Sequence, residues 1–197
     1  MAIALLIGSL LLICMLTLES AVVLSQDRSK PERIEATALG TDMQLGKEFD
    51  VCLIINAYSP RAGNQILVEA LQNGKDQGLV NALSKLKAVG HIAITGTPGY
   101  GVSYIQLIPT STGRKIRFVT SRLLRFGEVC RDGLSASYNL TAGEFELNDK
   151  DETKSTGVFF PEADLVIDKQ GEEQINLTGN PWKLVDIIDW KGTPGVN

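Results

Sequence analysis

Hydrophobic and polar positions divide the chain into three parts. Residues 2–18 form an apolar run without a charged side chain. Between residues 64 and 90 the apolar positions recur every three to four residues, and from His91 onward they alternate with polar ones in short runs. These patterns predict an N-terminal signal or membrane-anchor helix, a helical segment and a strand-rich remainder.

The N-terminal run has the features of a secretory signal. It is slightly short for a membrane-spanning helix, which needs about 20 residues. Val23 and Ser25 place compact side chains before a cleavage site after Ser25, and the polar stretch QDRSKPER follows. No Lys or Arg precedes the run, so an uncleaved anchor formed by residues 2–18 is the alternative. A lipid-modified Cys14 is less favoured, because Ile13 precedes it.

The helical segment is predicted as a hairpin. Leu79, Leu83 and Leu86 form a stripe at helical spacing, and Gly90 follows as a stop signal. Gly74 and Gly78 interrupt the segment between residues 64–73 and this stripe. We therefore expect either two helices in a hairpin or one helix broken at residues 74–78.

The remaining apolar runs predict strands. Residues 49–58 (FDVCLIINAY) form the first, and polar turns separate later runs such as HIAIT, VSYIQLIP, RKIRFVTSR, EFEL, GVFF, ADLVID, QINL and LVDIIDW. We expect an α+β domain over residues 49–192, mostly an antiparallel β meander closed as a barrel or folded as a sandwich. Residues 26–48, charged and containing Pro31, are expected to be a flexible lead-in, and residues 193–197 a frayed tail.

Charge and length narrow the class of protein. The formal charge is −4, and it becomes −3 without residues 1–25, whose only charged side chain is Glu19. A net acidic chain argues against a nucleic-acid partner, which requires a basic surface. About 170 residues remain after the signal, enough for one domain with a core of its own.

Two cysteines, Cys52 and Cys130, follow the N-terminal segment. In an oxidising compartment they would close a long loop and stabilise the fold. Cys52 lies inside the apolar run VCLII, however, and no larger cysteine framework is visible. We favour two separate thiols over the disulfide.

No catalytic or metal-binding motif emerges from the sequence. His91 is the only histidine, so a histidine cluster for a metal is excluded, and a solvated side chain is the favoured interpretation. The loop GTPGYG opens a strand and contains Pro98, which indicates a turn and not a phosphate-binding loop. Acidic residues between Glu144 and Glu152 lack the pattern of a calcium loop. We expect no cofactor.

A basic stretch supplies the candidate binding residues. Residues 114–131 carry six Arg or Lys side chains and one acid, Glu128. If RKIRFV is a strand, Lys115 and Arg117 share one face and would bind an anion. We assign Lys115, Arg117, Tyr104, Tyr100 and His91 as candidate ligand-binding residues. The favoured alternative is cross-strand pairing of the two bases with Glu144 and Glu146.

Three runs carry a family resemblance: QGLVNALSKLKAVGHIAITGT, SYIQLIPTSTGRKIRFVTSR and NPWKLVDIIDW. They resemble those of an uncharacterised family of short, predicted exported proteins from soil bacteria, over residues 49–190. That family has no assigned activity. The resemblance therefore implies export and a single domain, and it supplies no catalytic residue.

Three functions follow as hypotheses. We favour a periplasmic or secreted, non-enzymatic protein that binds an envelope protein or a small ligand through its sheet and meets the membrane only through its N-terminal segment. The second is a carrier that holds an apolar ligand inside a barrel. The third is an enzyme whose site combines dispersed residues such as His91, Tyr104 and Arg117.

Overall fold

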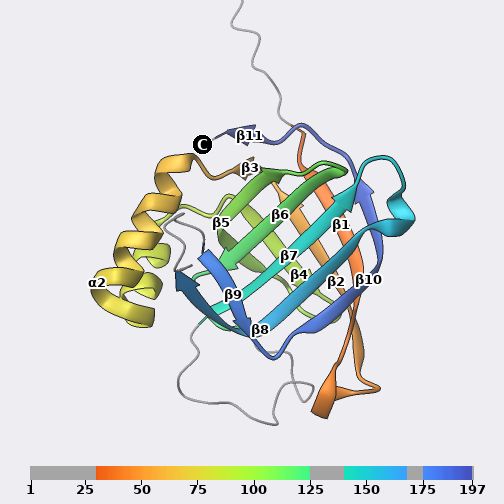
Figure 1. Ribbon diagram of the computed structural model, residues 1–197, viewed down its shortest axis with the longest axis horizontal. Helices are drawn as coiled ribbons and strands as arrows, with labels where there is room; N and C mark the ends of the chain where they lie inside the picture. The colour runs from red at the N-terminus through yellow and green to blue at the C-terminus, as the bar shows by residue number, and fades with distance from the viewer. Residues whose placement is uncertain (1–29, 125–139, 168–174, 197) are drawn as a thin grey trace, which may run out of the picture.

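The computed structural model describes residues 30–124, 140–167 and 175–196. Eight antiparallel strands close into a barrel in the spatial order β10-β1-β2-β4-β5-β6-β7-β8, and β8 pairs back onto β10 (Figure 1). The barrel strands are β1 (Glu32–Leu39), β2 (Glu48–Ile55), β4 (Gly90–Ile94), β5 (Tyr100–Pro109), β6 (Gly113–Thr120), β7 (Leu140–Asn148), β8 (Thr156–Ile167) and β10 (Trp182–Trp190).

The strand β10 closes the barrel through two pairings. At its start Trp182 lies opposite Phe159 of β8, and at its end Trp190 lies opposite Arg33 of β1. The prediction of a mostly antiparallel β fold is confirmed. Of the two arrangements that the sequence leaves open, the barrel is the one that forms, because β10 pairs on both of its sides.

One further strand extends the barrel sheet, and two short strands form a separate pair. The strand β9 (Ile175–Gly179) pairs with the last residues of β8. The two-residue strands β3 (Ala57–Tyr58) and β11 (Gly195–Val196) pair in parallel near the barrel mouth where β1 begins (Figure 1). Short 3₁₀ turns cover Asp42–Gln44 and Glu152–Lys154.

Side chains of the barrel strands alternate between the interior and the outer surface, as a pleated sheet requires. In β1, Glu32 and Ile34 are buried, while Arg33 between them is exposed. The interior is filled by one apolar cluster with aromatic residues at its centre. Its fully buried large side chains are Trp182, Phe118, Phe145, Phe159, Ile34, Leu53, Ile55 and Ile92.

The helix α2 (Arg61–Lys85) supplies the predicted helical hairpin. A Cβ placed on Gly78 would lie 2.5 Å from the carbonyl oxygen of Ala70, although residues eight apart in a straight helix are separated by about 12 Å. The segment therefore folds back on itself, and its two arms lie against the outside of the barrel (Figure 1). Leu67, Leu79 and Leu83 bury their side chains in this contact.

Two predicted boundaries are wrong. The expected flexible lead-in of residues 26–48 contains β1, which is paired with a neighbour on each side. Its exposed Arg33 and half-buried Glu35 give the segment a polar composition that conceals the alternating buried positions. The expected frayed tail of residues 193–197 contains β11, and the Gly195 amide donates to the carbonyl of Asn56 at 2.9 Å.

The predicted signal or anchor, residues 1–25, lies outside the described residues, as does Cys130. Within the described ranges no helix is long and apolar enough to cross a membrane. The described chain therefore forms one barrel with a helical hairpin on its outer surface.

Candidate functional site

The outer surface of β10, β1, β2 and β4 lies on the side of the barrel away from α2 (Figure 1). Strand register arranges its side chains in three rows, because residues opposite each other on antiparallel strands point to the same face. Read from β10 to β4, the rows are Trp190, Arg33, Ile54 and His91; Ile188, Glu35, Cys52 and Ala93; and Val185, Thr37, Asp50 and Thr95. We call this surface the outer face.

A groove with a volume of about 480 Å³ crosses the outer face. Three carboxylates line it, Glu35, Asp50 and Asp186, and its lining contains no Lys, Arg or His. Ile188 also lines it and is 49% exposed, while Trp190 next to it on β10 is 57% exposed. The groove is thus acidic, with large apolar side chains at its β10 end.

A β-bulge shapes the β10 end of the groove. The register between β1 and β10 shifts between Glu35 and Thr37, and Asp186 adopts a φ of 51° in this shift. Asp is one of the few non-glycine residues that tolerate the left-handed region. The extra residue in the bulge leaves Asp186 exposed at the edge of the groove.

Charge is balanced at one position of the groove and unbalanced at the others. Glu35 forms an ion pair with Arg33 and accepts a hydrogen bond at 3.0 Å from the Trp190 indole, and these contacts lower the pKa of its carboxyl group. Asp50 receives only hydroxyl hydrogen bonds, at 3.3 Å from Thr95 and 3.4 Å from Thr37. No cation among the described residues pairs with Asp50 or Asp186.

Two residues singled out in the sequence meet on this face. Cys52 lies in the middle row as a free thiol, opposite Ala93 of β4. His91 lies in the adjacent row of the same strand, opposite Ile54. The Nε2 atom of His91 is 3.3 Å from the carbonyl oxygen of Pro98, in the turn between β4 and β5. The structure confirms that the loop GTPGYG is a turn between strands, with positive φ at Gly96 and Gly99.

The predicted anion-binding strip is neutralised within the sheet. Glu144 on β7 accepts hydrogen bonds from Lys115 at 2.8 Å and from two nitrogens of Arg117, at 3.0 and 2.8 Å. Although burial raises the pKa of Glu144, these hydrogen bonds lower it overall. The favoured alternative, cross-strand pairing, is therefore confirmed for Glu144, whereas Glu146 is exposed and faces Lys115 only in register.

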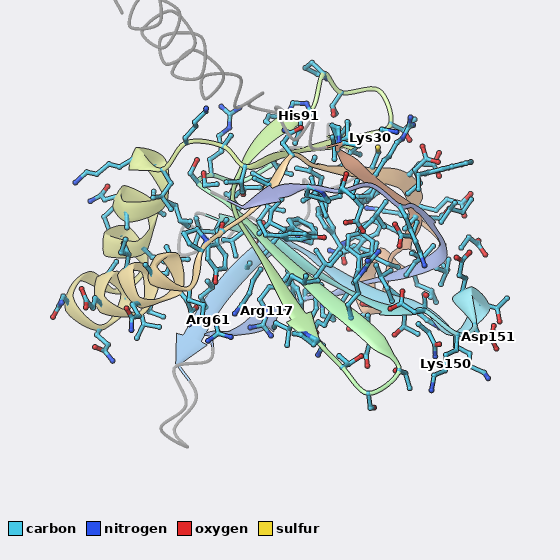
Figure 2. All side chains as sticks on the ribbon, turned by 90° about the horizontal axis from the view of Figure 1, so that it is seen from above. Lys30, Arg61, His91, Arg117, Lys150 and Asp151 are labelled. Carbon is cyan, nitrogen blue, oxygen red and sulfur yellow. The ribbon has the colours of Figure 1, made fainter. Side chains whose placement is uncertain are left out.

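The remaining candidates do not converge on a common site. Tyr104 is buried beneath α2, where its hydroxyl contacts Asn64 at 3.3 Å and burial raises its pKa to about 12. Tyr100 stacks under Arg122 at 4.9 Å, and partly packs against the barrel core. His91 on β4 and Arg117 on β6 flank β5 at positions five residues apart along that strand, opposite Gly101 and Gln106, and Figure 2 shows the two side chains well separated.

Four residues missed in the sequence form a charged network at the mouth where β1 begins. Arg114 of β6 contacts Glu32 of β1 at 2.7 Å and Asp189 of β10 at 2.5 Å. The Tyr58 hydroxyl donates to the other oxygen of Glu32 at 2.6 Å. Glu32 is 1% exposed, so this network lies inside the barrel. We call it the mouth network.

The mouth network holds two acids against one base. Burial raises the pKa of Glu32 more than Tyr58 and Arg114 lower it, and Asp189 raises it further. Burial and the bond to Glu32 also raise the pKa of Tyr58. Arg114 Nε and Asp189 Oδ1 are buried without a hydrogen-bond partner in the described structure. The network can retain a proton between its carboxyl groups. It also joins β6 to the paired strands β1 and β10, which lie far from it in the sequence.

Within the described ranges, no group of three His, Cys, Asp or Glu side chains is arranged to hold a metal ion. The arrangement defines a closed β-barrel with a filled interior and an open acidic groove on its outer face. Comparisons with protein-family models, with curated proteins and with solved structures found no match.

Proposed function

We propose that the protein is exported and acts as a non-enzymatic binding protein of the envelope or the extracellular space, with the groove of the outer face as its binding surface. The observation that carries this proposal is the groove itself, with Ile188 and Trp190 half exposed beside it. Large apolar side chains grouped at a solvent-facing groove are typical of binding surfaces. Its volume lies within the range of ligand sites, about 300–1,000 Å³.

The barrel interior gives less support to a carrier of an apolar ligand. A closed barrel is the fold that such a carrier needs. In this chain, however, Trp182, Phe118, Phe145 and Phe159 bury their rings inside it and pack with aliphatic side chains from the surrounding strands. The outer groove is therefore the better candidate for a ligand.

An enzyme with dispersed catalytic residues is also less supported. Its sequence candidates were His91, Tyr104 and Arg117. Arg117 is bound by Glu144, Tyr104 is covered by α2, and His91 is separated from Arg117 by β5 (Figure 2). General acid–base catalysis needs its groups within hydrogen-bond reach of one substrate.

Export rests on the apolar run of residues 2–18 and the polar stretch after Ser25. A cleaved signal would release the barrel into the periplasm or the medium, and a retained anchor would hold it at the membrane. Either outcome presents the groove outside the cytoplasm.

Photo-crosslinking in the native host tests the proposal. A benzophenone side chain at Ile188 should give a discrete adduct in the exported fraction, and the same probe at Gln72, exposed on α2, should not. A full-length chain confined to the soluble cytosol would refute export. Equal labelling from both positions, or none from Ile188, would refute the binding surface.

A further inference from the structure

We propose that the groove of the outer face binds an extended, basic peptide segment with apolar side chains. This inference rests on the proposed function and specifies the partner. Three carboxylates and no base line the groove. The charge complementary to such a lining is positive, and complementary charge steers and selects partners.

The carboxylates of Asp50 and Asp186 supply the negative charge that would attract a basic peptide. Glu35 already has Arg33 and the Trp190 indole as partners, so its charge is largely balanced. Asp50 has only long hydroxyl contacts, and Asp186 is exposed at the bulge. Thr37 separates the two in register, since it pairs with Asp50 on β2 and with Val185 on β10. The two carboxylates thus lie about two strand spacings apart, roughly 10 Å.

The dimensions favour a peptide over a small cation. The four strands of the outer face span about 14 Å at the usual spacing, which matches about four residues of an extended chain. The groove is only partly enclosed, whereas sites for small ligands bury most of the ligand surface. Two basic side chains on one face of an extended peptide would each reach one carboxylate.

The apolar side chains at the β10 end of the groove would contact the apolar side chains of the peptide. Ile188 and Trp190 alternate with Asp189 on β10, so both point outward beside the groove. Exposed aromatic side chains surrounded by polar residues are typical anchors of protein interfaces. An apolar side chain of the peptide would cover Ile188 and the Trp190 ring.

Binding of a fluorescein-labelled peptide of alternating Lys and Leu to the full chain in mild detergent tests this inference. Anisotropy should show saturable binding that weakens with added salt. The double variant Asp50→Asn with Asp186→Asn should weaken binding about ten-fold or more, because two charge contacts are lost. The matched variant Glu146→Gln with Glu152→Gln removes the same charge from exposed sites elsewhere and should bind as the unchanged chain does.

Three outcomes would overturn the inference. Equal binding of a Glu and Leu peptide would refute the charge assignment. Equal affinity for free lysine amide would refute a peptide partner. Equal binding by both double variants, with unchanged unfolding midpoints, would place the peptide elsewhere. If the peptide fails to bind while the Ile188 probe still forms its adduct, the groove remains a binding surface and only its basic partner is refuted.

Discussion

Removing the base of the mouth network should destabilise the barrel strongly. Among the described residues, Arg114 is the one cation paired with Glu32 and Asp189, whose side chains are 2% and 6% exposed, and Arg114→Met removes it. Breaking a buried ion pair by deleting one partner costs about 3–5 kcal/mol, because the other charge stays buried without compensation. Urea unfolding at neutral pH, followed by circular dichroism, measures this loss. We expect it to fall in that range.

The neighbouring substitution Lys115→Met is the matched control. It removes the same charge one residue away, but Lys115 is on the outer surface and its partner Glu144 keeps Arg117. The cost should stay below about 1 kcal/mol, because Glu144 keeps both hydrogen bonds from Arg117 and is itself less buried than Glu32. Equal losses for the two variants would refute the claim that burial makes the mouth network important.

The pH dependence provides a second test of the same variant. The pKa of Glu32 is raised in the folded protein, so its contribution to stability is present below the ordinary value of 4.5 and is lost as pH rises through the raised pKa. Arg114 lowers this pKa, and its removal raises it further. The penalty of Arg114→Met should therefore be largest at neutral pH and shrink below pH 4.5. A penalty that is constant with pH would contradict the reasoning.

Five other substitutions, at four positions, test the surface charge, the packing and the backbone. Glu144→Gln should cost about 2–4 kcal/mol at neutral pH by removing the carboxylate charge that Lys115 and Arg117 share. Because the pKa of Glu144 is lowered in the folded protein, the difference from the unchanged protein should shrink as pH falls below 4.5 and vanish below the lowered pKa; a difference that stays constant with pH in urea titrations would contradict this. Trp182→Phe should cost less than about 1.5 kcal/mol, since the buried indole nitrogen has no hydrogen-bond partner among the described residues. Trp182→Ala should cost about 3–5 kcal/mol in the same assay, because it leaves a cavity. Equal losses for the two variants would refute this reasoning. Gly99→Ala should lower the thermal midpoint, because Gly99 has a φ of 79° and a Cβ would lie 2.3 Å from His91 Nε2. Gly74→Ala should raise stability by about 0.4–1 kcal/mol, because the site has open space and alanine reduces the conformational freedom of the unfolded chain. A shift of the same sign in both would be inconsistent with the backbone argument.

Features set by residues near one another in sequence were predictable. The helical hairpin and its break follow from local leucine spacing and from Gly74 and Gly78. The pairing of Arg117 with Glu144 was also predictable, because β6 and β7 are consecutive strands and opposite charges attract across them. Lys115 shows the limit of that reasoning, since it faces Glu146 in register but bonds to Glu144.

Features set by distant pairings were not predictable. Arg114 is 82 residues from Glu32 and 75 from Asp189, so no local pattern links them. A signal did exist in ERIEATAL, where Glu32 shares the inward parity of Ile34. The groove was missed for the same reason, because its carboxylates come from β1, β2 and β10, and only the register of the closed barrel brings them together.

The closure of the barrel by β1 and β10 has a consequence for the timing of folding. The contact between the Trp190 indole and Glu35 joins positions 155 residues apart. The last barrel strand to be synthesised, β10, must therefore pair with the first, β1. Such long-range pairing is slow, because the entropy lost on closing the intervening loop is offset only after the contacts form. While β10 is absent, β1 and β8 both keep an unpaired edge. A chain of this topology can complete its barrel only after β10 has emerged, close to the end of synthesis.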